Sequence, residues 1–122
     1  MAKNHTDKNF QKAINDLKLY RSGWANDIRE GWVNHMKGSQ EILFSLYEIS
    51  GCIILALEND IAGHFHDKMP LILVQRKLEK LVTSPDFQYF NEMGKEGMCG
   101  VVTNATKHHI RVMLKMLEIL TD

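Results

Sequence analysis

The run ILFSLYEISGCIILAL, at positions 42–57, is the most apolar stretch of the chain. No turn signal divides it, and it is longer than a typical strand, so it predicts a helix that follows an N-cap at Ser39. Apolar residues occur around almost its whole circumference, which predicts a helix that is buried nearly all round. We therefore expect this segment at the centre of a helical bundle or in a subunit interface. It is too short and too polar in its middle to span a membrane, which takes about 20 apolar residues.

A second helical pattern precedes this run. From Phe10 to Met36 the apolar residues recur at steps of three and four, which keeps one side of a long helix apolar. Thr6 or Asp7 is the expected cap of this helix. Gly23 lies inside the pattern and weakens the expectation of a continuous helix, because glycine destabilises a helix interior by about 1 kcal/mol relative to alanine.

Three further segments follow the apolar run. Pro70 is expected in the first turn of the next helix, where its missing N–H is not needed. Ser84 followed by proline predicts another start. The last helix is expected to begin at Thr103 or Asn104, or near Lys95 if Gly100 is tolerated inside it. The sequence thus predicts an all-α, single-domain bundle of four to five helices with a long N-terminal helix and a central apolar helix, at about 7–36, 40–58, 70–83, 85–93 and 104–121.

Charge is balanced overall but unevenly distributed. The chain of 122 residues carries 15 basic and 15 acidic side chains, so no global field attracts nucleic acid or an anionic membrane. Residues 1–40 carry seven basic and four acidic groups, whereas residues 41–69 carry one basic and five acidic groups. Such segregation favours charge-matched contact, either within one fold or between subunits.

The two cysteines indicate no disulfide framework. Cys52 lies within the apolar run, where a free thiol behaves as a small hydrophobic residue, so we interpret it as a core residue. No basic segment followed by an apolar stretch opens the chain, and a reducing cytoplasm is the expected compartment.

The six histidines raise the question of a metal site. A helical site usually takes ligands three or four residues apart, and no two histidines here have that spacing. His64 and His66 lie on the same side of an extended segment, close in sequence to Asp60. A metal-dependent hydrolase that uses these three residues is one enzyme alternative.

The stretch NHMKGS, at positions 34–39, resembles the His-x-Leu-Lys-Gly-Ser motif of histidine-containing phosphotransfer domains, which are helical bundles of about this length. Alignment on Lys37 and the two residues after it places Asn34, and not His35, at the position of the phosphorylated histidine. The resemblance therefore implies a pseudo-phosphotransfer adaptor that does not accept phosphate.

Arg29 and His35, separated by five residues, resemble the Arg-to-His motif of the HEPN helical ribonuclease family. In that family both residues serve RNA cleavage across a dimer. The resemblance implies a ribonuclease that uses these two side chains.

The very apolar segment at 42–57, a first helix long enough to project and the segregated charge suit association better than an enzyme pocket, and no recognised nucleophile or cofactor motif occurs. We expect a small binding or regulatory protein that acts by stoichiometric contact with a protein or a small ligand, as virus- or mobile-element-encoded inhibitors do. We also expect a homo-oligomer, with no cofactor, no metal and no catalytic residues. The candidate binding residues are aromatic, cationic and histidine side chains: Trp24, Arg29, Trp32, His35, Lys37, His64 and His66.

Overall fold

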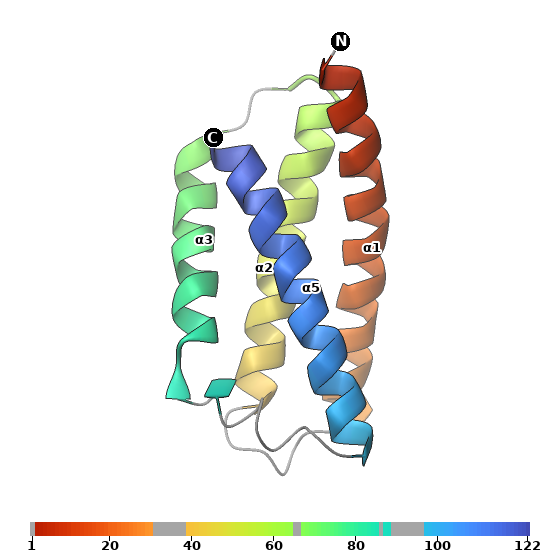
Figure 1. Cartoon of the computed structure of the whole chain (residues 1–122), viewed down its shortest axis with the longest axis vertical. Helices are drawn as coiled ribbons and strands as arrows, with labels where there is room; N and C mark the ends of the chain where they lie inside the picture. Colours follow the sequence, from red (N-terminus) through yellow and green to blue (C-terminus); the bar gives the residue numbers. More distant parts are fainter. Residues whose placement is uncertain (1, 31–38, 65–66, 86, 89–96) are drawn as a thin grey trace.

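The computed structural model covers residues 1–122 and describes all of them except 1, 31–38, 65–66, 86 and 89–96. Four helices are described: α1 (Ala2–Glu30), α2 (Ser39–Ile61), α3 (Lys68–Val82) and α5 (Gly97–Thr121). They alternate in direction along one long axis, with α5 crossing in front of α2 and with α3 and α1 on either side (Figure 1). The expected all-α fold is confirmed, and the helices of the described residues are consistent with a four-helix bundle. Within the described residues, none of these helices combines the length and the apolar content that a membrane span requires.

Helix α1 follows the predicted apolar pattern. Phe10, Ile14, Leu17 and Trp24 are at most 2 % exposed. The helix continues through Gly23, so the glycine does not interrupt it. The predicted cap at Thr6 or Asp7 is wrong, because both positions lie inside the helix. The predicted end at residue 36 lies outside the described residues.

Helix α2 supplies the largest share of the core, but it is not buried all round. Leu43, Leu46, Ile53 and Leu57 are fully buried. The prediction of a helix shielded on nearly every side is nevertheless wrong. One strip of α2 faces solvent because α1, α3 and α5 cover only the remaining sides, and it carries Glu41, Phe44, Glu48, Cys52, Leu55 and Glu58.

The exposed strip also corrects the interpretation of one cysteine. Cys52 is exposed, although the sequence placed it in the core. It is four residues from Glu48 and three from Leu55, so it shares a side of the helix with both. Position around the helix axis, and not the apolar character of the run, decides its exposure.

Helix α3 begins two residues earlier than expected, because Asp67 and not proline starts it. The Asp67 carboxylate accepts a hydrogen bond from the Met69 N–H at 3.0 Å, which satisfies a backbone donor that has no partner within the helix. Pro70 then lies in the first turn, where its missing N–H costs nothing. Leu71 and Leu78 fix the buried side.

The C-terminal helix α5 begins at Gly97, so the predicted caps at Thr103 and Asn104 are wrong and the alternative start near Lys95 is the better one. Its buried side carries Met113 and Leu117, which are 0 % exposed. Of the short helix expected at 85–93, only the start is described. There the Ser84 hydroxyl accepts a hydrogen bond from the N–H of the buried Phe87 at 3.2 Å, as a cap does.

The open surface around Gly23 yields a stability prediction. A Cβ atom added at this position meets nothing within 4 Å, and the backbone is helical. Gly23→Ala should therefore raise the free energy of unfolding by about 1 kcal/mol, through the higher helix propensity of alanine. Urea titration followed by circular dichroism measures this difference.

Gly63 is the matched control, because a Cβ atom there also meets nothing, yet its φ is +76°. Gly63→Ala should lower the free energy of unfolding by about 1 kcal/mol, since an L-residue with a side chain is strained in that conformation. Equal effects at the two positions would contradict a helix that is continuous through Gly23.

Candidate binding surface

Large apolar side chains that remain exposed mark surfaces where binding of a partner releases free energy, because it covers apolar area. Two of them lie on α2, where Phe44 is 51 % exposed and Leu55 is 61 % exposed. They are eleven residues apart, which is close to three full turns, so both point to the same side of the helix. This side of α2 is therefore partly apolar although no other described helix of the bundle covers it.

Phe44 also forms one wall of an open hollow between α1 and α2. The hollow has a volume of about 320 Å³ and lies between the C-terminal half of α1 and the N-terminal half of α2. Its walls are mostly apolar, and one cation stands among them. The lining residues are Ala25, Ile28, Arg29, Phe44 and Tyr47.

Arg21 fixes the position of Tyr47 beside this hollow. Its Nε donates a hydrogen bond to the Tyr47 carbonyl oxygen at 3.0 Å, and its guanidinium carbon lies 3.9 Å from the centre of the Tyr47 ring. Gly51 leaves the space for this arrangement, since a Cβ atom there would lie 3.0 Å from an Arg21 nitrogen. The hydrogen bond and the cation–π contact together hold α1 against α2.

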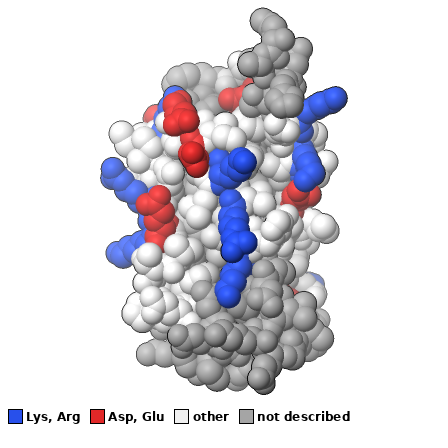
Figure 2. Space-filling model, viewed as in Figure 1, with Lys and Arg blue, Asp and Glu red and all other residues white. Residues whose placement is uncertain are grey.

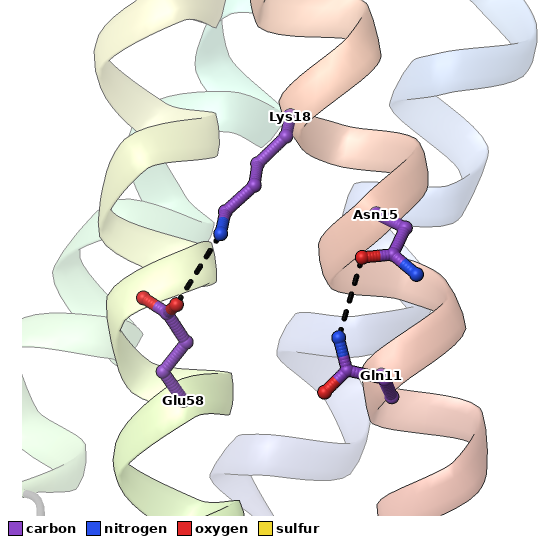
Figure 3. A network of polar contacts seen from close by, with 4 residues as sticks. All are labelled: Gln11, Asn15, Lys18 and Glu58. Carbon is purple, nitrogen blue, oxygen red and sulfur yellow. Dashed lines mark hydrogen bonds and ion pairs between the residues drawn. The ribbon is translucent and has the colours of Figure 1, made fainter.

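The two helices bring opposite charges to this side of the molecule. Lys18 on α1 reaches across to Glu58 on α2, with 3.5 Å between Nζ and Oε2 (Figure 3). Both side chains are about half exposed, so the pair adds little stability. The pair does show that Lys18 and Glu58 lie at the same level along the long axis of the bundle.

We call this surface the α1–α2 face. Its α1 side is cationic and its α2 side is anionic, with apolar side chains and the hollow between them. It comprises Lys18, Arg21, Ala25, Ile28, Arg29, Phe44, Tyr47, Glu48, Leu55 and Glu58.

A different kind of surface lies over α5. Figure 2 shows basic side chains in a column along this helix, where Lys107, Arg111 and Lys115 follow one another at four-residue steps. A hollow of about 310 Å³ separates α5 from α1, and Lys12 and Asp16 on its rim pair with each other at 3.5 Å. The walls of this hollow are also partly apolar, and Ile119 on α5 is 40 % exposed, but the hollow is rimmed by charged side chains, and its apolar residue is less exposed than Phe44 and Leu55 on α2.

A partly buried aromatic cluster lies between α1 and α5. The Tyr20 and His109 rings stack with centroids 3.4 Å apart and planes 9° from parallel. Trp24 packs edge-on against His109 at 5.6 Å and donates a hydrogen bond from its ring nitrogen to the Thr106 hydroxyl at 3.3 Å. The His109 Nδ1 atom is buried without a hydrogen-bond partner among the described residues.

The surroundings of His109 keep it uncharged. Its pKa is lowered from the ordinary 6.5 to about 4, chiefly by burial and also by the neighbouring His108, while Asp16 opposes the shift. At neutral pH the ring is therefore a packing element and not a proton carrier. Burial also raises the pKa of Tyr20, and the carboxylate of Asp16 adds to that shift.

The candidate binding residues that the structure describes lie in different parts of the fold. Arg29 is exposed on the α1–α2 face, where it donates a hydrogen bond to the Asn26 side chain at 3.0 Å. Trp24 is 2 % exposed in the core, and His64 is exposed beyond the end of α2. The remaining candidates lie outside the described residues: Trp32, His35, Lys37 and His66.

The enzyme and adaptor alternatives depend on residues outside the described part. The ribonuclease needs His35, and the phosphotransfer motif spans positions 34–39, of which only Ser39 is described. Among the described residues, no three histidine, cysteine, aspartate or glutamate side chains lie close enough together to hold a metal ion. The metal hypothesis also includes His66, so it stays a hypothesis.

Comparison with known proteins returns no matching family model, no matching curated protein and no matching solved structure.

Sequence reasoning singled out only Arg29 on this surface, and the residues that it missed include Arg21, Tyr47, Phe44 and Leu55. The last two were assigned to the core because they belong to the apolar run. A signal for the first two was present in Gly51, since a glycine inside a helical pattern often marks a close approach by another group. The identity of that group depends on how α1 packs against α2.

The depressed pKa of His109 yields a prediction about acid stability. The unfolded chain takes up a proton at this residue near pH 6.5, whereas the folded chain does so only near pH 4. Stability is therefore lost as pH falls from 6.5 to 4, and this group has no effect above pH 7. Because His109 is only partly buried, we expect the loss to be on the order of 1 kcal/mol.

His109→Phe keeps a stacking ring and removes the titrating nitrogens, so it should lose less stability than the wild-type protein between pH 6.5 and 4. Thermal melts across this range measure the difference. The control is His64→Phe, the same change at an exposed position. If all three proteins lose the same stability between pH 6.5 and 4, the pKa of His109 is not lowered by folding.

Proposed function

We propose that the chain is a small binding protein without catalytic activity, which acts by stoichiometric contact of its α1–α2 face with a protein partner. The observation that carries this proposal is the exposure of Phe44 and Leu55 beside the hollow of about 320 Å³. Small helical regulators and inhibitors act in this way, and we expect this one to work in a reducing cytoplasm as a homo-oligomer.

The apolar side chains supply a driving force of useful size. Covering the exposed half of Phe44 contributes on the order of 2 kcal/mol, at about 25 cal/mol per Å² of apolar area. Leu55 adds a comparable amount from a position three turns away. An interface centred on a few such residues and rimmed by charges has the usual composition of a protein contact.

The shape of the hollow favours a protein partner over a small ligand. Its volume of about 320 Å³ is at the lower end of small-molecule pockets, which are commonly about 300–1,000 Å³. It is also open to solvent, so it does not enclose a small molecule. A single apolar side chain from a partner fits it, with Arg29 available to a carboxylate beside that side chain.

The proposal predicts that one charge placed at the hollow weakens binding. Amphipathic helical peptides selected from a displayed library on the wild-type protein serve as the probe, and fluorescence polarisation measures their affinity. Phe44→Asp should weaken the selected peptides at least about tenfold, because the carboxylate replaces the apolar wall.

The control variant is Leu73→Asp on α3, where the leucine is 56 % exposed, close to the exposure of Phe44. It should leave peptide affinity unchanged. Selected peptides that bind both variants as tightly as they bind the wild-type protein would overturn the assignment of binding to the α1–α2 face.

A further inference from the structure

The charges of the α1–α2 face make it complementary to a second copy of itself. The cations lie on α1, at Lys18 and Arg29, and the carboxylates lie on α2, at Glu48 and Glu58. The two helices run antiparallel beside each other (Figure 1). The face is thus divided lengthwise into a positive half and a negative half.

A symmetric dimer places the same patch of both copies in contact, and two orientations bring these helices together. If the twofold axis runs parallel to the helices, α1 of each copy lies on α2 of the other. If the axis lies across the helices, α1 lies on α1 and α2 on α2. Only the first orientation sets cations against carboxylates, and the second sets like charges against each other.

The height of the residues along the bundle supports the same orientation. A rotation about an axis parallel to the helices leaves each residue at its own height. Arg29 shares a hollow with Phe44, one turn before Glu48, so in the dimer it comes near Glu48 of the other copy. The hollows of the two copies also face each other, and each Phe44 is covered by the other copy's α1.

Two further observations leave these charges free for such a contact. Neither Arg29 nor Glu48 forms an ion pair within the described part of the chain, and both are exposed. Lys18 and Glu58 are already paired with each other within the copy. The second copy therefore supplies an opposite charge to each of these two side chains, which have no ion-pair partner among the described residues.

We propose that two copies of this chain associate through the α1–α2 face about a twofold axis parallel to the helices, with Arg29 of each copy beside Glu48 of the other. The dimer rests on the proposed function, since it names one occupant of that binding face.

Charge reversal at the two positions tests the pairing. Arg29→Glu places carboxylate against carboxylate in the dimer, and Glu48→Arg places cation against cation. Each single variant should weaken dimerisation at least about tenfold, as measured by sedimentation equilibrium between about 1 and 100 µM. An equimolar mixture of the two variants should restore the dimer, because each reversed charge then meets an opposite one.

The double variant R29E/E48R separates the two orientations. With the axis parallel to the helices, the introduced glutamate of one copy meets the introduced arginine of the other, so the double variant dimerises as the wild-type protein does. With the axis across the helices, residues 29 and 48 do not meet, so the effects of the two changes add independently and the double variant does not recover what the single variants lose. The matched controls are Lys77→Glu and Glu79→Arg, which make the same charge changes at exposed positions on α3 and should have no effect.

The outcomes distinguish this inference from the proposed function. A wild-type protein that is monomeric at about 100 µM overturns the dimer, while Phe44→Asp still decides the peptide-binding face. If Phe44→Asp breaks the dimer and the charge reversals leave it intact, only the proposed pairing of Arg29 with Glu48 about the twofold axis is overturned. If none of the variants in the α1–α2 face changes the dimer or the peptide binding, both the dimer through this face and the proposed function are overturned.

Discussion

The bundle depends on the packing of α2 against the three other described helices. Its apolar residues extend further around its circumference than α1, α3 and α5 can cover. The residues that turn inward, including Leu43, Leu46, Ile53 and Leu57, form the largest contribution of any one described helix to the core. The strip that is left over faces water with Phe44 and Leu55 on it. The same excess of apolar residues thus builds the core and leaves a surface suited to binding.

The local patterns of the sequence were sufficient to predict the helices and the class of fold. The steps of three and four from Phe10 onward predicted the buried side of α1, and the unbroken run at 42–57 predicted a helix. Helix starts were predicted less well, since a cap depends on a single hydrogen bond. Asp67 starts α3 through its bond to Met69, whereas the proline signal pointed two residues later.

Exposure within the apolar run could not be predicted in the same way. Cys52 and Ile53 are adjacent and both apolar, yet the first is exposed and the second is fully buried. Only the directions of the neighbouring helices distinguish them, and these are set by tertiary packing. The glutamates at 41 and 48 were the clue to the exposed strip, because carboxylates at helical spacing mark the side that faces water. Arg29 alone among the described candidates lies on the α1–α2 face.

The contact of Arg21 with Gly51 also selects one alignment of the two antiparallel neighbours α1 and α2. A helix surface repeats at each turn, so apolar side chains alone allow α1 to slide along α2 by about 5 Å and pack again. The guanidinium packs closely over Gly51, where a Cβ atom would lie 3.0 Å from its nitrogen, and no other glycine occurs in α2. A slipped alignment would press it against a larger side chain and separate it from the Tyr47 carbonyl. The close contact at Gly51 therefore favours one register of α1 on α2, and with it one position of the hollow on the surface.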